Sequence, residues 1–200
     1  MKTTRKDEAQ TIQEFIDRTD LVLTHYIMSM NQKPKIAIKY FNTDYPVLEK
    51  IPKGDWIDLR VDSIKNHRFI GKDTNHDDRT DKILKQCGEI NYGKGEIITF
   101  GLGVAMELPE GYEAIVAPRS STFKHWGFIQ TNGIGVIDNT YCGNDDEWSV
   151  QFLTTRSGSI RRFDRVCQFR IQKNQPALEF KTVSNLDNPN REGRGSTGRA

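Results

Sequence analysis

The chain has 200 residues, which suits one domain with an extension rather than two full domains. Its formal net charge of +2 is close to balanced, so we expect no broad nucleic-acid surface. The charged start of the chain does not resemble a signal peptide, and no apolar run is long enough to span a bilayer. The three cysteines lack the paired spacing of a disulfide framework or zinc site. These features predict a soluble, cytoplasmic protein with no membrane partner.

The first predicted element is a helix near the N-terminus. A Thr-x-x-Glu capping box, followed by large apolar residues at helical spacing, predicts one amphipathic helix over residues 11–30. Pro34 ends this pattern. Because an apolar stripe must pack against something, we expect residues 1–33 to contact the body of the protein, a neighbouring subunit or another protein partner.

Alternating apolar and polar residues predict that most of the remaining chain, residues 34–186, is a β domain. Short strands at regular spacing favour an antiparallel all-β sandwich or barrel. A stretch rich in Asp, Lys, Asn and Gly, residues 62–95, is interpreted as a polar insertion. Its His76-Asp77-Asp78 run is typical of a charged loop, because no second ligand pair stands at a defined spacing for a metal. Strands are predicted at 35–40, 56–61, 97–100, 102–108, 112–117, 148–154 and 159–171.

The stretch from Gly127 to Gly143, GFIQTNGIGVIDNTYCG, carries the strongest functional signal. Asn132-Gly133 between two apolar runs predicts a β-hairpin, because both residues tolerate the positive φ of a type I′ turn. Asp138 directly follows the second run. A carboxylate at a strand end can have its basicity tuned by desolvation, so Asp138 is a candidate catalytic base.

The same stretch resembles motif three of the trimeric dUTP pyrophosphatases (dUTPases), a Gly-x-Ile-Asp-x-x-Tyr-x-Gly pattern that stands here at residues 135–143. The resemblance implies an all-β, dUTPase-like jelly-roll or β-clip barrel, to which the N-terminal helix is an addition. It also implies that the protein hydrolyses dUTP to dUMP and pyrophosphate with Mg²⁺, which limits uracil incorporation into DNA. Such enzymes are homotrimers with shared active sites.

The resemblance assigns roles to four residues of this stretch. Asp138 would be the general base that activates water for attack on the α-phosphorus. Asn132 and Gly133 would hold uracil through backbone groups that mimic base pairing. Tyr141 would pack on the deoxyribose and leave no room for a 2′-hydroxyl group.

Two further segments resemble motifs one and two. Asp58, in an Ile-Asp-Leu run, matches the carboxylate that holds water on Mg²⁺, although Trp56 stands where small residues are expected. Arg119, Ser120 and Ser121 match a phosphate-binding turn, with Ser121 in place of the family's Gly. A guanidinium, a hydroxyl and successive backbone amides suit a phosphate, because all of them donate hydrogen bonds.

The segment from Asp164 to Gln168 resembles motif four, which implies that Arg165 and Gln168 lie near the phosphates. Phe163 replaces the Gly of that motif, so we expect a different entry into its turn. Without the other motifs, an exposed cross-strand pair would explain Arg165 and Gln168.

The Gly-rich tail, residues 187–200, is predicted to be a flexible arm. It resembles motif five, in which an Arg and a Gly-Ser-Thr run close over the phosphates and a Phe stacks on uracil. Arg194 occupies the position of that Phe, so either its guanidinium stacks on the base or base closure is weaker. The residues that the resemblance places on the substrate are Arg191, Arg194, Gly195, Ser196 and Thr197.

Two alternatives remain at this point. A dCTP deaminase of the same superfamily would need a catalytic Glu on the strand after Gly143, where Glu147 is the only nearby candidate. A non-catalytic relative could use the same fold as a protein-binding module, with the N-terminal helix and the insertion as its surface. The motif-three residues Asp138 and Tyr141 favour the enzyme.

Overall fold

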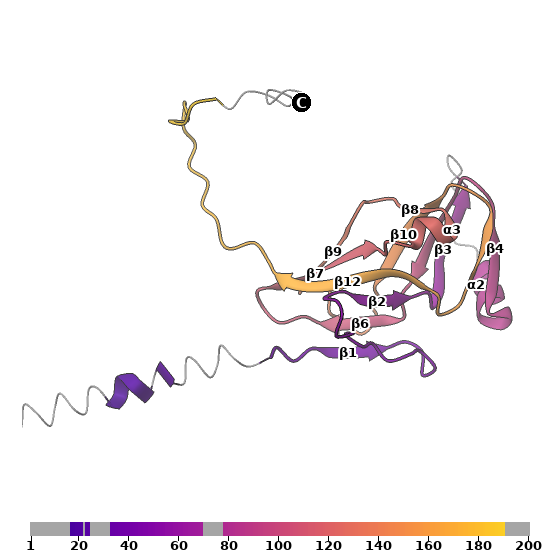
Figure 1. The fold of residues 1–200 in the computed structure, drawn as a ribbon, viewed down its shortest axis with the longest axis horizontal. Coiled ribbons are helices and arrows are strands. Elements are labelled where there is room, and N and C mark those ends of the chain that lie inside the picture. Colours follow the sequence, from indigo (N-terminus) through magenta and orange to yellow (C-terminus); the bar gives the residue numbers. More distant parts are fainter. Residues whose placement is uncertain (1–16, 22, 25–32, 70–77, 191–200) are drawn as a thin grey trace, which may run out of the picture.

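Antiparallel β-strands form most of the protein in a computed structural model, which describes residues 17–21, 23–24, 33–69 and 78–190. The elements are β1 (Ala37–Tyr40), β2 (Ile57–Arg60), β3 (Ser63–Phe69), α2 (Asp78–Cys87), β4 (Glu89–Tyr92), β5 (Glu96–Gly101), β6 (Val104–Glu107), β7 (Tyr112–Pro118), α3 (Thr122–Trp126), β8 (Phe128–Gln130), β9 (Gly135–Asp138), β10 (Ser149–Thr154), β11 (Gly158–Arg161) and β12 (Arg165–Lys173). Figure 1 shows their arrangement. The prediction of an all-β fold is confirmed.

Two four-stranded sheets organise the chain, in the orders β3-β5-β10-β8 and β2-β12-β7-β9. Two small sheets, β1-β6 and β11-β4, complete the structure. Alternate residues of the strands are buried, as in β10, where Val150, Phe152 and Thr154 point inward. This period of two gives each large sheet one apolar face, and the two faces share a single hydrophobic cluster.

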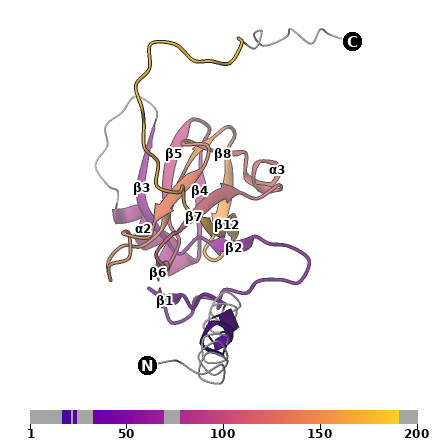
Figure 2. The same ribbon diagram turned by 90° about the vertical axis from the view of Figure 1, so that its left-hand side faces the viewer.

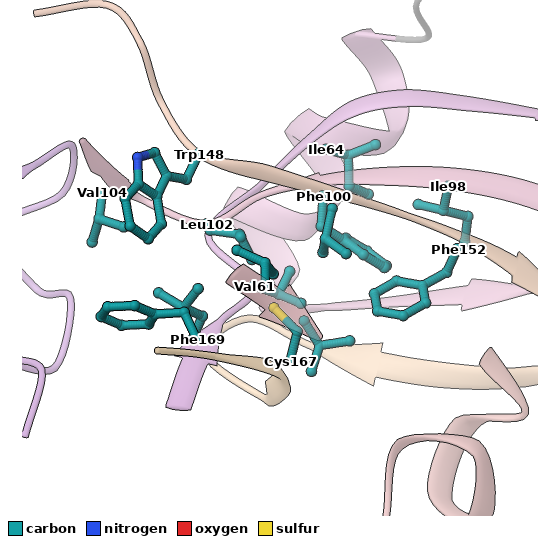
Figure 3. Packing of buried hydrophobic residues seen from close by; sticks show 14 of the residues in the cluster. Val61, Ile64, Ile98, Phe100, Leu102, Val104, Trp148, Phe152, Cys167 and Phe169 are labelled. Carbon is teal, nitrogen blue, oxygen red and sulfur yellow. The ribbon is translucent and has the colours of Figure 1, made fainter. Parts of the chain in front are cut away.

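Aromatic side chains fill the core between the sheets. The indole of Trp148 meets the ring of Phe169 edge-on at 5.3 Å between centroids. Phe128 stacks on Phe152 at 5.2 Å, and Phe100 contacts both. Figure 3 shows Trp148, Phe169, Phe100 and Phe152 among the packed side chains of this core. Edge-on and offset contacts of this kind stabilise aromatic cores beyond the area they bury.

The insertion at residues 62–95 is more structured than its composition suggests. It supplies β3, which pairs with β5 at the edge of a large sheet, and then α2 and β4. The backbone N–H of Ile64 donates to Asp81 Oδ1 at 2.8 Å, and Leu84 is fully buried. Because a short helix needs few apolar residues to pack against a strand, the polar composition of this stretch did not indicate that α2 contacts β3. Residues 70–77, with His76 and Asp77, lie outside the described part of the chain.

The predicted hairpin at Asn132-Gly133 is wrong. β8 pairs with β10 and β9 pairs with β7, so the two arms belong to different sheets. Gly133 has φ 70°, but a type I′ turn also needs a positive φ at Asn132. Phe163 is the only described non-glycine residue with positive φ, so this turn is not type I′. The N–H of Ile134 instead donates to the Asn132 carbonyl at 2.7 Å, which closes a γ-turn over Gly133. The Asn-Gly signal located the turn correctly but not the partner strands.

Both ends of the described chain are exposed. Residues 17–21 and 23–24 are helical, with Leu21 and Leu23 on the surface; the rest of the predicted helix 11–30 lies outside the described residues. Figure 2 shows this helical part below β1. The last strand ends at Lys173, before the predicted boundary at 186, and residues 174–190 run away from the sheets without helix or strand (Figure 1). None of the described helices is long and apolar enough to cross a membrane.

Phe163 has φ 68°, in the left-handed region that favours glycine. Its N–H donates to the Val61 carbonyl at 2.7 Å, and its ring meets Tyr45 edge-on at 5.8 Å. The turn before β12 therefore has a conformation suited to glycine even though the residue is Phe. These contacts offset the steric cost of left-handed backbone at a residue with a Cβ atom.

We expect Phe163→Gly to be more stable than Phe163→Ala by about 0.5–1 kcal/mol. Both variants lose the ring contacts, but only Ala retains the Cβ atom that strains a φ of 68°. Urea unfolding at one fixed protein concentration measures the difference. An Ala variant as stable as the Gly variant would mean that the turn relaxes to another conformation.

Candidate active site

Strand β12 brings the residues of three sequence motifs together. It lies between β2 and β7, and its register places Gln168 opposite both Asp58 and Ala117. A register shift between Arg165 and Cys167 marks an irregularity in the pairing with β2. Antiparallel pairing of this kind aligns residues that are far apart in sequence. Asp58, Arg119, Arg165 and Gln168 therefore meet at one end of the sheet.

One carboxylate joins the two arginines of this group. Asp58 Oδ1 accepts Arg119 Nε at 2.7 Å, and Asp58 Oδ2 lies 3.1 Å from Arg165 Nη1. Arg119 Nη1 also donates to the Arg165 carbonyl at 3.0 Å. Two guanidinium groups facing one carboxylate leave an excess of positive charge. Such a group suits phosphate oxygens, which accept charge-assisted hydrogen bonds from arginine.

These residues line a cleft of about 430 Å³. The structure thus brings together five predicted site residues: Asp58, Arg119, Ser120, Arg165 and Gln168. Arg60 and Trp56 also line the cleft, although the motifs assign neither residue a role in binding. Arg60 follows Asp58 by two residues in the same strand, and such residues point to the same face of a sheet. This spacing was the sequence feature that could have predicted its place in the cleft.

Thr122 is a site residue that the sequence did not reveal. It is fully buried, its Oγ1 donates to the Val166 carbonyl at 2.9 Å, and the N–H of Arg119 donates to Oγ1 at 3.0 Å. This side chain ties the turn of Arg119 to β12. Ser121 caps α3 without a side-chain hydrogen bond. The only sequence feature that could have indicated this role is the Thr three residues after Arg119, and that spacing is common in turns.

Cys167 lies behind the arginine group but does not act in it. The side chain is fully buried, and burial raises the pKa of its thiol. A thiol held neutral in an apolar core is a poor nucleophile. We therefore assign Cys167 to the core.

The motif-three residues lie elsewhere on the surface. Asp138 ends β9 opposite Glu113 of β7, and its carboxylate is exposed and makes no ion pair or hydrogen bond within the described residues. The N–H of Tyr141 donates to the Asp138 carbonyl at 3.1 Å, and Tyr141 Oη donates to the Glu147 carbonyl at 3.3 Å. Asn132 and Gly133 are also exposed. A free carboxylate beside an anchored tyrosine can accept a proton from bound water.

The structure does not bring Asp138 into the arginine cleft. Along β7, Asp138 faces Glu113, whereas Arg119 follows the other end of the strand at Pro118. Six residues of strand separate these positions, or about 20 Å. None of Asn132, Gly133, Asp138 and Tyr141 lines the cleft. The tail residues Arg191, Arg194, Gly195, Ser196 and Thr197 lie outside the described residues.

Glu147, the carboxylate that a deaminase would need, already has structural partners. It is 7% exposed, forms an ion pair with Lys65, and accepts the N–H of Gly103 at 2.9 Å. A buried carboxylate held in this way stabilises the chain around it, and removing its partners would be costly. The geometry does not favour Glu147 as a catalytic base.

The described residues contain no cluster of three or more His, Cys, Asp or Glu side chains that could hold a metal ion. Mg²⁺ does not require one, because it commonly keeps several waters and binds through one or two carboxylates and substrate phosphates. Each Asp58 oxygen keeps a lone pair beyond its arginine contact. Asp58 therefore fits an ion held through water.

The two-sheet fold and the arginine cleft define an all-β protein suited to binding a phosphorylated ligand. A family model described as dUTPase matches residues 89–198. The SPbeta prophage-derived deoxyuridine 5′-triphosphate nucleotidohydrolase YosS of Bacillus subtilis strain 168 is 42% identical over 82% of this chain and 98% of its own length. The deoxyuridine 5′-triphosphate nucleotidohydrolase of Streptomyces coelicolor is 34% identical over 58% of this chain and 63% of its own. The chain belongs to the dUTPase family.

Solved structures agree in fold. A Staphylococcus bacteriophage 80alpha dUTPase with dUPNHPP has a TM-score of 0.57 at 14% identity, over 83% of this chain and 99% of that one. A dUTPase from phage phi11 of S. aureus, described with a structural Mg(II) ion, has a TM-score of 0.55 at 12% identity, over 77% of this chain and 99% of that one. These likenesses support the architecture of the two sheets.

Proposed function

We propose that the protein hydrolyses dUTP to dUMP and pyrophosphate. The exposed carboxylate of Asp138, free of partners within the described chain and one turn from Tyr141, carries this proposal. Membership of the dUTPase family supports it. A non-catalytic protein-binding role would not require a free carboxylate beside an anchored tyrosine.

In the proposed reaction, the nucleotide's triphosphate is bound and oriented by Arg119, Ser120, Arg165 and Gln168. Asp138 accepts a proton from a water as the water oxygen bonds to the α-phosphorus. The bond between that phosphorus and the oxygen bridging to the β-phosphate breaks, and pyrophosphate leaves. Positioning and charge stabilisation supply most of the catalysis in such transfers.

We propose Mg²⁺ as the cofactor, with Asp58 holding one of its waters. Bound Mg²⁺ would offset the negative charge of the triphosphate. The two arginines beside Asp58 would then hold its carboxylate in a fixed orientation.

We propose that the active enzyme is a homotrimer whose sites are shared between subunits. About 20 Å of strand separates Asp138 from Arg119 in one chain, which is too far for both to serve one substrate. A neighbouring subunit would supply the second half of each site. The arm at 187–200 would close over the phosphates and the base through Arg191, Arg194, Gly195, Ser196 and Thr197.

A nucleotide panel tests the function. The full-length protein is incubated with dUTP, UTP, dCTP and dTTP, with and without Mg²⁺, and pyrophosphate and ammonia are measured. We expect Mg²⁺-dependent pyrophosphate from dUTP alone. Ammonia from dCTP would establish the deaminase instead. If neither pyrophosphate nor ammonia forms, the remaining interpretation is a non-catalytic binding protein.

We expect Tyr141→Ala to lower the preference for dUTP over UTP by at least about tenfold, or 1.4 kcal/mol. Tyr141 is 42% exposed, and removing its ring opens space beside C2′ of a bound sugar. The kcat/KM ratio for the two nucleotides measures the change. Tyr141→Phe is the matched control, because it removes only the hydroxyl that donates to Glu147 and should keep the preference. An unchanged ratio in the Ala variant would assign sugar selection to another residue.

A further inference from the structure

We infer that Gln130 is a positioning residue for base discrimination, because it fixes which end of the Asn132 side-chain amide faces the ligand. Gln130 ends β8 directly before the turn that carries Asn132 and Gly133. No motif includes it. The inference rests on the proposed function, since it concerns how the same site tells uracil from cytosine.

Gln130 is a buried amide with two hydrogen-bond partners. Its side chain is 5% exposed, and Nε2 donates to the Val116 carbonyl of β7 at 3.3 Å and to Asn132 Oδ1 at 3.1 Å. Gly135 of β9 lies beside both residues: a Cβ atom there would meet Gln130 Nε2 at an ordinary contact distance of 3.9 Å and Val116 Cβ more tightly, at 3.3 Å. The side chain thus links the turn to the strand beneath it.

The backbone carbonyl decides the orientation of both amides. The Val116 oxygen can only accept, so the Gln130 atom that faces it must be the nitrogen. The Asn132 atom that faces this nitrogen must then be the oxygen. The Asn132 NH₂ group is therefore left for an outside partner, and the residue is exposed. An amide without this neighbour could present either end.

The resemblance places backbone groups of Asn132 and Gly133 on uracil, and an outward NH₂ group would add a side-chain donor that favours uracil over cytosine. The two bases differ at C4, where uracil carries a carbonyl oxygen, as thymine does, and cytosine carries an amino group. A donor on the protein pairs with the carbonyl but meets another donor on cytosine. Leaving a polar group of a site unpaired is an effective way of rejecting a wrong ligand.

Gln130 also carries a stability cost that this role explains. Its Oε1 is buried and has no hydrogen-bond partner among the described residues. A methionine of similar length would remove that unsatisfied oxygen, so packing alone does not account for a glutamine here. For the same reason, we expect Gln130→Met to fold.

The test measures base discrimination in binding. Full-length parent, Gln130→Met, Asn132→Ala and the double variant are titrated with the α,β-imido analogues of dUTP and dCTP by calorimetry, and the ratio of the two Kd values is compared. We expect Gln130→Met to lower the preference for the uracil analogue by about tenfold. Asn132→Ala should lower it to a similar degree, and the double variant should lose no more than Asn132→Ala, because Gln130 acts through Asn132.

Gln151→Met is the matched control. Gln151 Oε1 accepts Thr131 Oγ1 at 3.0 Å, so this amide also supports the turn but does not touch Asn132. We expect its base preference to stay within about twofold of the parent. An unchanged ratio in Gln130→Met, an equal loss in Gln151→Met, or additive losses in the double variant would each overturn the inference. A parent that binds neither analogue and releases no pyrophosphate from dUTP would instead overturn the proposed function, and this inference with it.

Discussion

Asp138→Asn is expected to lower kcat for dUTP by at least about 100-fold while nucleotide binding stays close to that of the parent. The amide has the shape of the carboxylate but cannot take the proton of the attacking water. Because the Asp138 side chain is exposed and has no partner within the described residues, the change should not disturb the sheet. Pyrophosphate release measures kcat, and titration with the imido analogue of dUTP measures binding.

Glu113→Gln provides the matched control for that variant. Glu113 stands opposite Asp138 in the register of β7 and β9, and its Oε1 accepts Gln172 Nε2 at 2.9 Å. The substitution removes a neighbouring carboxylate without touching the proposed base, so we expect kcat within about threefold of the parent, or roughly 0.65 kcal/mol in barrier. Turnover of Asp138→Asn inside the same limit would remove Asp138 from the mechanism.

The motif residues could be predicted because their signals are local. Asp58, Arg119 and Gln168 stand in short runs with fixed internal spacing, and the structure brings these three side chains to one cleft. The strands could be predicted for the same reason, since an alternation of buried and exposed residues is visible over four to seven residues.

The remaining features depend on contacts between distant parts of the chain. The turn at Asn132 was visible, but the pairing of β8 with β10 and of β9 with β7 is set by strands far along the sequence. The same holds for the roughly 20 Å between Asp138 and Arg119, which follows from their places along β7. Gln130 and Thr122 act through backbone carbonyls of other strands, and a sequence does not show which carbonyl a side chain will meet.

A buried ion pair gives the second large expected effect. Asp62 is 4% exposed; its Oδ1 accepts Arg162 Nη2 at 2.7 Å and Asn42 Nδ2 at 3.2 Å. Its N–H donates to the Gly101 carbonyl at 2.9 Å. Asp62 therefore joins the segment between β2 and β3 to the loop before β12. No motif contains Asp62, and in the sequence it reads as one of many charged residues.

We expect Asp62→Ala to lower the free energy of unfolding by about 3 kcal/mol, because it leaves the guanidinium of Arg162, 21% exposed, without its partner. Asp55→Ala is the control: the Lys50–Asp55 pair is 59% and 76% exposed, so its loss should cost less than about 1 kcal/mol. Urea unfolding at one fixed protein concentration measures both, since the stability of an oligomer depends on concentration.

The double variant Asp62→Ala/Arg162→Ala separates the two contributions within that loss. If the cost of Asp62→Ala is mainly an unpaired buried charge, then removing Arg162 as well should recover part of the stability. A double variant that is no more stable than Asp62→Ala would place the cost in the Asn42 contact and the packing around Asp62 instead. A single variant as stable as the Asp55→Ala control would mean that water enters and solvates Arg162, and the pair would then count as a surface contact.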